Sequence, residues 1–255
     1  MNKDTKELRE VFTKNLPMFQ RGEGEQLIDK VFSPFTFHFS RKRAAFTLAE
    51  VLITLGIIGV VATMTIPVLI NKYQEQVTVN KVKKFYSMIN QALLMSIKDN
   101  GYIDEWQYSN VTEFADYLKP YLKIIKDCGT QSGCLSIGKK IYLSGNGTTQ
   151  SYDSGNYYRM ILADNSYMWF RKSFNNNSCI DSDGGWSNIC GLIFIDINGN
   201  KKPNTFGKDT FVFYIQKSAI ITSNQNAYKC DAQNSFGYAC ASYILTNGNM
   251  DYLHK

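Results

Sequence analysis

The feature that most constrains this chain is an uncharged stretch of twenty residues, Val51 to Ile70. As a helix it measures ~30 Å, which matches the hydrocarbon core of a bilayer. Arg41, Lys42 and Arg43 stand shortly before it, and basic residues beside a membrane segment stay on the cytoplasmic side. We therefore predict one membrane crossing, with the N-terminus inside the cell and the residues after Ile70 outside the cytoplasm.

Two simpler interpretations of this segment are a cleaved secretory signal peptide and a plain signal anchor. The apolar region is too long for a signal peptide, and no small-residue cleavage site follows it. Glu50 argues against both interpretations, because a carboxylate at the start of an apolar helix is costly and usually has a function and a partner. The plain anchor stays open on these grounds alone.

Residues 41–50 read RKRAAFTLAE, which resembles the processing site of type IV prepilins and type II secretion pseudopilins. In that family a prepilin peptidase cuts after a basic leader on the cytoplasmic side and methylates the new N-terminus, usually Phe. The resemblance places the cut between Ala45 and Phe46, with Glu50 four residues beyond the new N-terminus. Because a carboxylate in the bilayer needs a partner, we expect Glu50 to pair with the amine of Phe46 in assembly. It extends to about residue 98.

The chain departs from the family pattern in two ways. Ala45 stands before the cut, where the family overwhelmingly has Gly. The predicted leader is also long, 45 residues, and initiation at Met18 would shorten it to 28. We expect residues 1–45 to be removed on processing and to have no later role.

Beyond the membrane segment, apolar residues recur every three to four positions from Val82 to Ile97, as in a helix with one buried stripe. Gly101 is the expected end of this helix. Pro67 removes one backbone hydrogen bond, and Gly59 and Pro67 fall where the family commonly softens or kinks its helix. One helix of about fifty residues, ~75 Å, is predicted. A helix of this length implies packing against something beyond its own domain.

After residue 100 the chain has short apolar runs between turn formers. Residues 112–125 are typical of a helix interrupted at Pro120. Two strand pairs are predicted: 157–163 with 167–172, and 192–197 with 210–216, the last strand having one buried face. The predicted organisation is a leader (1–45), a transmembrane helix (46–70), its amphipathic continuation (71–99) and a globular head (100–255). The fold class is α+β, a pilin-like long helix on an antiparallel sheet, as the resemblance also implies.

All six cysteines follow the membrane segment, which points to disulfides in an oxidising compartment. Six cysteines allow fifteen pairings, and the short separations suggest that sequence neighbours pair. The candidate pairs are Cys128–Cys134, Cys179–Cys190 and Cys230–Cys240.

The loop between the last two predicted strands carries oxygen donors at Asp196, Asn198 and Asn200, with Asp209 at its far end. Such a set suits a hard cation, and Ca²⁺ is the one cofactor that the sequence raises. The alternative is a hairpin loop of turn-forming residues, in which three nearby lysines repel a cation. The resemblance favours calcium slightly, because some major pseudopilins bind it in a C-terminal loop.

The sequence shows no sign of catalysis. His38 and His254 are its two histidines, no Ser-His-Asp set or phosphate-binding loop can be assembled, and the carboxylates are scattered. We therefore expect a protein that is not an enzyme. Nine basic and six acidic residues precede position 46, with nineteen and sixteen after it. This even spread argues against nucleic-acid binding.

Together these features predict a structural subunit of a type IV pilus-like fibre or a type II secretion pseudopilus, assembled through its N-terminal helix. The expected partners are the lipid bilayer, other pilin or pseudopilin subunits, the prepilin peptidase, an inner-membrane platform protein and an assembly ATPase. The expected location is the inner membrane, with the head in the periplasm or, in the fibre, outside the cell. The alternative is an unprocessed, single-pass anchored extracytoplasmic binding domain.

Overall fold

The computed structural model describes residues 46–135, 137–172, 179–226 and 228–254. The chain divides into two units, 1–56 and 57–255, and the boundary falls within the longest helix. This helix, α2 (Leu48–Asn100), has 53 residues, and Gly101 ends it with φ +78°. The predicted length and the predicted end of the helix are both confirmed.

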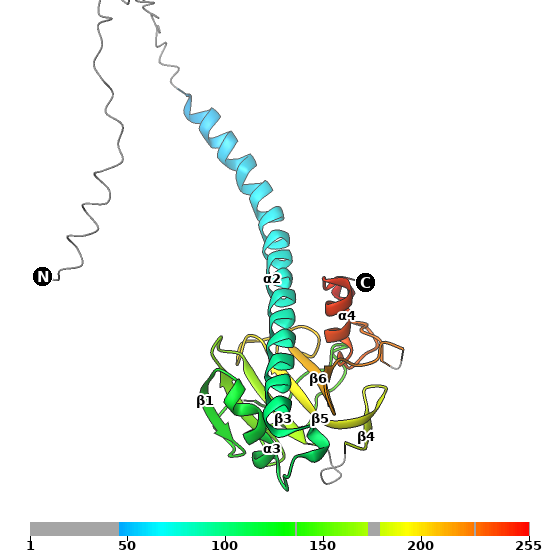
Figure 1. Cartoon of the computed structure of the whole chain (residues 1–255). Helices are drawn as coiled ribbons and strands as arrows, with labels where there is room; N and C mark the ends of the chain where they lie inside the picture. Colours follow the sequence, from blue (N-terminus) through cyan, green and yellow to red (C-terminus); the bar gives the residue numbers. More distant parts are fainter. Residues whose placement is uncertain (1–45, 136, 173–178, 227, 255) are drawn as a thin grey trace, which may run out of the picture. The chain divides into compact units, whose positions relative to one another are not determined.

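Seven strands form one antiparallel sheet in the order β1-β2-β3-β5-β6-β7, with β4 also paired to β5 (Figure 1). The strands are β1 (Ile124–Gly129), β2 (Tyr158–Leu162), β3 (Tyr167–Lys172), β4 (Asp181–Asp183), β5 (Trp186–Asp196), β6 (Thr210–Gln216) and β7 (Ile220–Ile221). Both predicted strand pairs are present. In the first, Asn165 turns the chain with φ +63°, and the Asp164 carboxylate accepts the Ser166 N–H.

The remaining elements are shorter helices that lie in the sequence either between α2 and the first strand or after the last strand. After α2 come η1 (Ile103–Glu105), α3 (Val111–Leu118) and η2 (Lys119–Tyr121), and after the sheet come α4 (Cys240–Asn247) and η3 (Asp251–Leu253). Residues 124–125, predicted as helix, instead begin strand β1. The α-helix ends at Leu118, Pro120 lies in the short η2 that follows, and the β-branched Ile124 then pairs with β2.

The second half of α2 packs on one face of the sheet. Its buried stripe contains Val79, Val82, Phe85, Ile89, Ala92, Leu93 and Ser96. The Phe85 ring lies 5.4 Å from the ring of Phe213 in β6. Polar contacts fix the same packing: Asn90 accepts the Ile220 N–H at 3.1 Å, and the Ser96 hydroxyl donates to the Tyr117 carbonyl at 2.6 Å. The predicted pilin-like arrangement of a long helix on an antiparallel sheet is confirmed.

The last long strand, β6, is buried on both faces, which corrects the prediction of one buried face for it. Phe211 and Phe213 belong to the core beneath α2, whereas Val212 and Tyr214 belong to a second apolar cluster on the opposite face. Side chains from the long segment between β1 and β2, among them Tyr152, cover this second face. The alternation of side chains is as predicted, but both sets are apolar and both are covered.

Three disulfides fasten the head. They join Cys128 to Cys134, Cys179 to Cys190 and Cys230 to Cys240, the sequence neighbours that the short separations suggested. The first ties β1 to the loop that follows it, the second joins the segment before β4 to β5, and the third anchors the first residue of α4. Short covalent loops of this kind stabilise a fold by ~2–3 kcal/mol each in the chain-entropy model.

Candidate functional site

The start of α2 carries the residues that a processing enzyme and a neighbouring subunit would meet. Phe46 is 80% exposed. Thr47 and Glu50 form a reciprocal cap: the Glu50 carboxylate accepts the Thr47 N–H at 2.9 Å, and the Glu50 N–H donates to the Thr47 hydroxyl at 3.2 Å. This is a capping box, which satisfies two of the free N–H groups at a helix start.

The sequence pattern led us to Glu50 but not to Thr47, its hydrogen-bond partner in the structure. The signal was available, because Thr followed three positions later by Glu before an apolar run is the pattern of a capping box. Glu50 therefore has a partner within its own chain before any other subunit arrives. The predicted cleavage residue Ala45 and the cluster of Arg41, Lys42 and Arg43 lie outside the described residues.

The apolar half of α2 has no covering partner within the described part of the chain. Within that part, α2 is the one helix that is long and apolar enough to cross a membrane, and no residue of its most apolar stretch is buried. Side chains such as Leu52, Ile58 and Met64 are 61–71% exposed. The helical assignment runs unbroken through Gly59 and Pro67, so the structure retains helix at both, and the expected kink stays a prediction.

The loop between β5 and β6 surrounds a buried cluster of charged groups. Asp196, at the end of β5, is fully buried, and its carboxylate contacts the ammonium of Lys140 at 2.5 Å. Lys140 is 2% exposed and also donates to the Asn204 side-chain oxygen at 2.9 Å. Its ammonium lies 5.5 Å from the centre of the Trp169 ring. The cluster joins the segment between β1 and β2 to the loop.

Asp209 closes the same loop from its other end. Its two carboxylate oxygens accept the N–H groups of Asn204 and Thr205 at 2.6 and 2.7 Å. Asn198 donates to the same carboxylate at 3.3 Å, while the fourth predicted donor, Asn200, is exposed. The structure thus brings three of the four candidate metal ligands together. Hydrogen bonds engage the carboxylates of Asp196 and Asp209, whereas the buried side-chain oxygen of Asn198 has no hydrogen-bond partner among the described residues.

Lys140 already supplies a positive charge to one of these carboxylates, Asp196. Calcium requires six to eight oxygen ligands, and the candidate set offers the carboxylates of Asp196 and Asp209 and the side-chain oxygen of Asn198 within this loop. Burial raises the pKa of Asp196 to about 6 and raises the pKa of Asp209, while the Lys140 charge opposes both shifts. The calcium ion itself stays an untested prediction. Lys140 had no signal in the sequence, since 56 positions separate it from Asp196.

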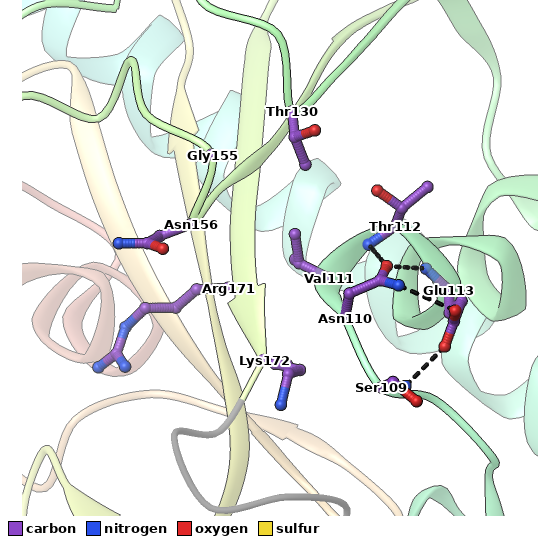
Figure 2. Close-up of a pocket in the computed structure, with 10 residues that line it drawn as sticks. All are labelled: Ser109, Asn110, Val111, Thr112, Glu113, Thr130, Gly155, Asn156, Arg171 and Lys172. Carbon is purple, nitrogen blue, oxygen red and sulfur yellow. Dashed lines mark hydrogen bonds between the residues drawn. The ribbon is translucent and has the colours of Figure 1, made fainter.

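An open cleft of about 730 Å³ lies beside the start of α3 (Figure 2). Its lining includes Ser109, Asn110, Val111, Thr112, Glu113, Thr130, Gly155, Asn156, Arg171 and Lys172. The polar atoms on the helix side are used locally: Asn110 caps the N–H groups of Thr112 and Glu113, and Glu113 accepts from the Ser109 N–H. Because these groups serve the helix cap, we assign the cleft no ligand.

Comparison with known protein families identifies the N-terminal part of the chain. Residues 40–66 match the model of the prokaryotic N-terminal methylation motif, which marks a prepilin-like protein with a processing site for prepilin peptidase. Together with the exposed apolar helix, the motif indicates an inner-membrane anchor carrying an extracytoplasmic domain.

Residues 68–251, which are 184 of the 255, match the model of a family of unknown function (DUF6613). The chain belongs to this family. The match to the methylation motif ends at residue 66 and the match to this family begins at residue 68. Both positions lie within α2, close to the end of the apolar segment. The searches of curated proteins and of solved structures returned no match.

Proposed function

We propose that the chain is a structural subunit of a type IV pilus-like or type II secretion pseudopilus fibre. Prepilin peptidase releases Phe46 as the new N-terminus, the subunit waits in the inner membrane, and its N-terminal helix then packs against the helices of like subunits. An inner-membrane platform protein and an assembly ATPase drive that step. The subunit has no enzymatic role in this proposal.

The observation that carries the proposal is the contrast between the two halves of α2. The half from Val79 to Ser96 buries one face against its own sheet, whereas the half before Ile70 is exposed on all faces for most of its length. A fully apolar helix needs an apolar environment around its whole circumference. Lipid supplies that environment before assembly, and neighbouring helices supply it within a fibre. A helix whose apolar surface can be covered first by lipid and then by neighbouring helices suits a subunit that leaves the membrane.

The competing function is an anchored binding domain that is never processed or assembled. It accounts for the exposed helix but gives no role to the Phe46 end of the methylation motif. A plain anchor would be expected to contact lipid alone through the apolar segment.

Photo-crosslinking in living cells separates the two functions. A photoreactive amino acid at Leu55, which is 60% exposed in the apolar half, is expected to give a ladder of covalent multimers when the assembly machinery is present. The matched control is the same residue at Lys217, whose ammonium pairs with Asp104 beyond the C-terminal end of α2. A Leu55 variant that stays monomeric in cells assembling fibres would contradict the proposal.

A further inference from the structure

One face of the head lies directly beside the end of the apolar segment. A cavity of about 660 Å³ is lined on one side by Asn71 and Tyr73 of α2, and on the other by Lys201, Lys202 and Lys208 of the β5–β6 loop. Ile70 is the last residue of the uncharged stretch, so Asn71 and Tyr73 follow the hydrocarbon core immediately. The C-terminal η3 contributes Leu253 to the same lining, and the adjacent His254 contacts Glu75 of α2 at 2.8 Å.

These positions correspond to the headgroup layer of the bilayer. That layer is about 5–8 Å thick on each side of the hydrocarbon core, and residues 71–75 rise ~6 Å along the helix. Tyr73 is 70% exposed, and Tyr is enriched at the membrane–water interface. The lysines that share a cavity with these residues therefore lie at the level of the lipid phosphates.

In the β5–β6 loop the acidic side chains are buried and the basic side chains are exposed. Its two carboxylates, Asp196 and Asp209, are turned inward and buried, whereas its three lysines are exposed. Lys72 on α2 is a fourth exposed cation, and it lines an adjoining cavity that shares Glu75 and His254 with the first. Within the described ranges, no carboxylate lies within ion-pair distance of these four ammonium groups. The buried Lys140 stabilises this arrangement because its ammonium neutralises Asp196. The loop lysines are therefore not needed as partners for that carboxylate.

We infer that Lys72, Lys201, Lys202 and Lys208 form a lipid-docking face that binds anionic phospholipid headgroups of the bilayer that the same chain spans. This inference rests on the proposed membrane-anchored state before assembly. Docking on headgroups holds the head against the membrane surface in a fixed orientation. The contact is released when the subunit is lifted into a fibre, where no lipid surface faces the loop.

Lysine acylation in nanodiscs tests the docking face. The full chain is placed, one copy per disc, in phosphatidylcholine or in an equal mixture of phosphatidylcholine and phosphatidylglycerol, and a neutral acylating reagent is followed by mass spectrometry. Acylation of Lys201, Lys202 and Lys208 is expected to slow about fivefold in the anionic discs, the change that one lysine contact with an anionic surface produces. High salt, which shortens the screening length to ~3 Å at 1 M, should abolish the protection.

Lys98 is the internal control, because it is exposed in the last turn of α2, ~42 Å along the helix from Ile70. Its rate should not depend on the lipid. In the double variant Lys201→Gln/Lys202→Gln, the remaining Lys208 should lose most of its protection. Equal rates in both lipids would overturn the inference, and so would protection seen only in discs holding several copies, which would mark a contact between subunits. Failure of the chain to enter discs at all would instead contradict the proposed function.

Discussion

Replacing Lys140 by methionine is expected to lower the free energy of unfolding by about 3–5 kcal/mol, the effect of removing one partner of a buried ion pair. The ammonium of Lys140 is the cation that contacts the buried carboxylate of Asp196, and methionine fills the same space without charge. Urea unfolding in detergent measures the change. Trp169 is a suitable fluorescent reporter because its ring lies beside the Lys140 ammonium.

Two further variants separate charge from packing in this experiment. The neighbouring exposed lysine, in Lys139→Met, should change stability by less than about 0.5 kcal/mol. The double variant Lys140→Met/Asp196→Asn should recover most of the loss, since it removes the uncompensated charge. A double variant as unstable as Lys140→Met alone would show that packing, and not charge, is responsible.

The loss in Lys140→Met should also depend on pH. In acid, well below the ordinary Asp pKa of about 3.9, the Asp196 carboxyl is protonated in both the folded and the unfolded chain, so the missing ammonium matters least. The loss should grow as pH rises past about 6, because the folded unchanged protein then ionises Asp196, whereas without Lys140 the buried carboxyl resists ionisation further. We expect the unchanged protein to melt at the same temperature with and without a calcium chelator. A lower melting temperature in chelator, abolished by Asp196→Ala, would instead establish the calcium ion that the oxygen pattern of the loop predicts.

Replacing Glu50 by glutamine is expected to leave cleavage after Ala45 intact and to reduce fibre yield at least about tenfold. A charged carboxylate in the bilayer costs about 2.5–3.5 kcal/mol unless a partner neutralises it. The amine that processing creates on Phe46 lies ~6 Å along the axis from Glu50, and the amine of an incoming subunit could meet Glu50 of its neighbour. Such a pair would favour assembly and fix the axial register. Fibres sheared from the cell surface are quantified alongside the N-terminal sequence.

The capping box gives this experiment its control. Glutamine at the third helical position can still accept the Thr47 N–H, so Glu50→Gln keeps the cap and removes only the charge. Thr47→Val does the reverse, because it removes the capping hydroxyl and keeps the carboxylate. If the pairing is correct, Glu50→Gln and Glu50→Ala both fail to assemble while Thr47→Val assembles. Normal fibre yield from Glu50→Gln would refute the pairing and leave Glu50 as a helix cap.

Local patterns in the sequence were sufficient for much of the fold. The length of α2, its end at Gly101 and the two strand pairs follow from periodicity and turn residues that lie close together in the chain. The short cysteine separations likewise suggested the three disulfides in the structure.

Features that depend on distant segments were not predictable in this way. The burial of Val212 and Tyr214 depends on Tyr152 and its neighbours crossing the far face of the sheet, and alternation within one strand carries no information on that. The pairing of Lys140 with Asp196 arises for the same reason from a fold that brings two remote segments together. The acidic loop therefore suggested a metal site, whereas in the structure the neutralising charge belongs to a lysine elsewhere in the chain.

The most direct test of the whole account is mass spectrometry of the chain extracted from the membrane of cells that contain prepilin peptidase. We predict an N-terminal peptide that begins at Phe46 and carries one methyl group on its amine. Cells lacking the peptidase should give a peptide that begins within residues 1–45. An intact leader in the presence of an active peptidase would contradict the account and leave an anchored binding domain as the function of this chain.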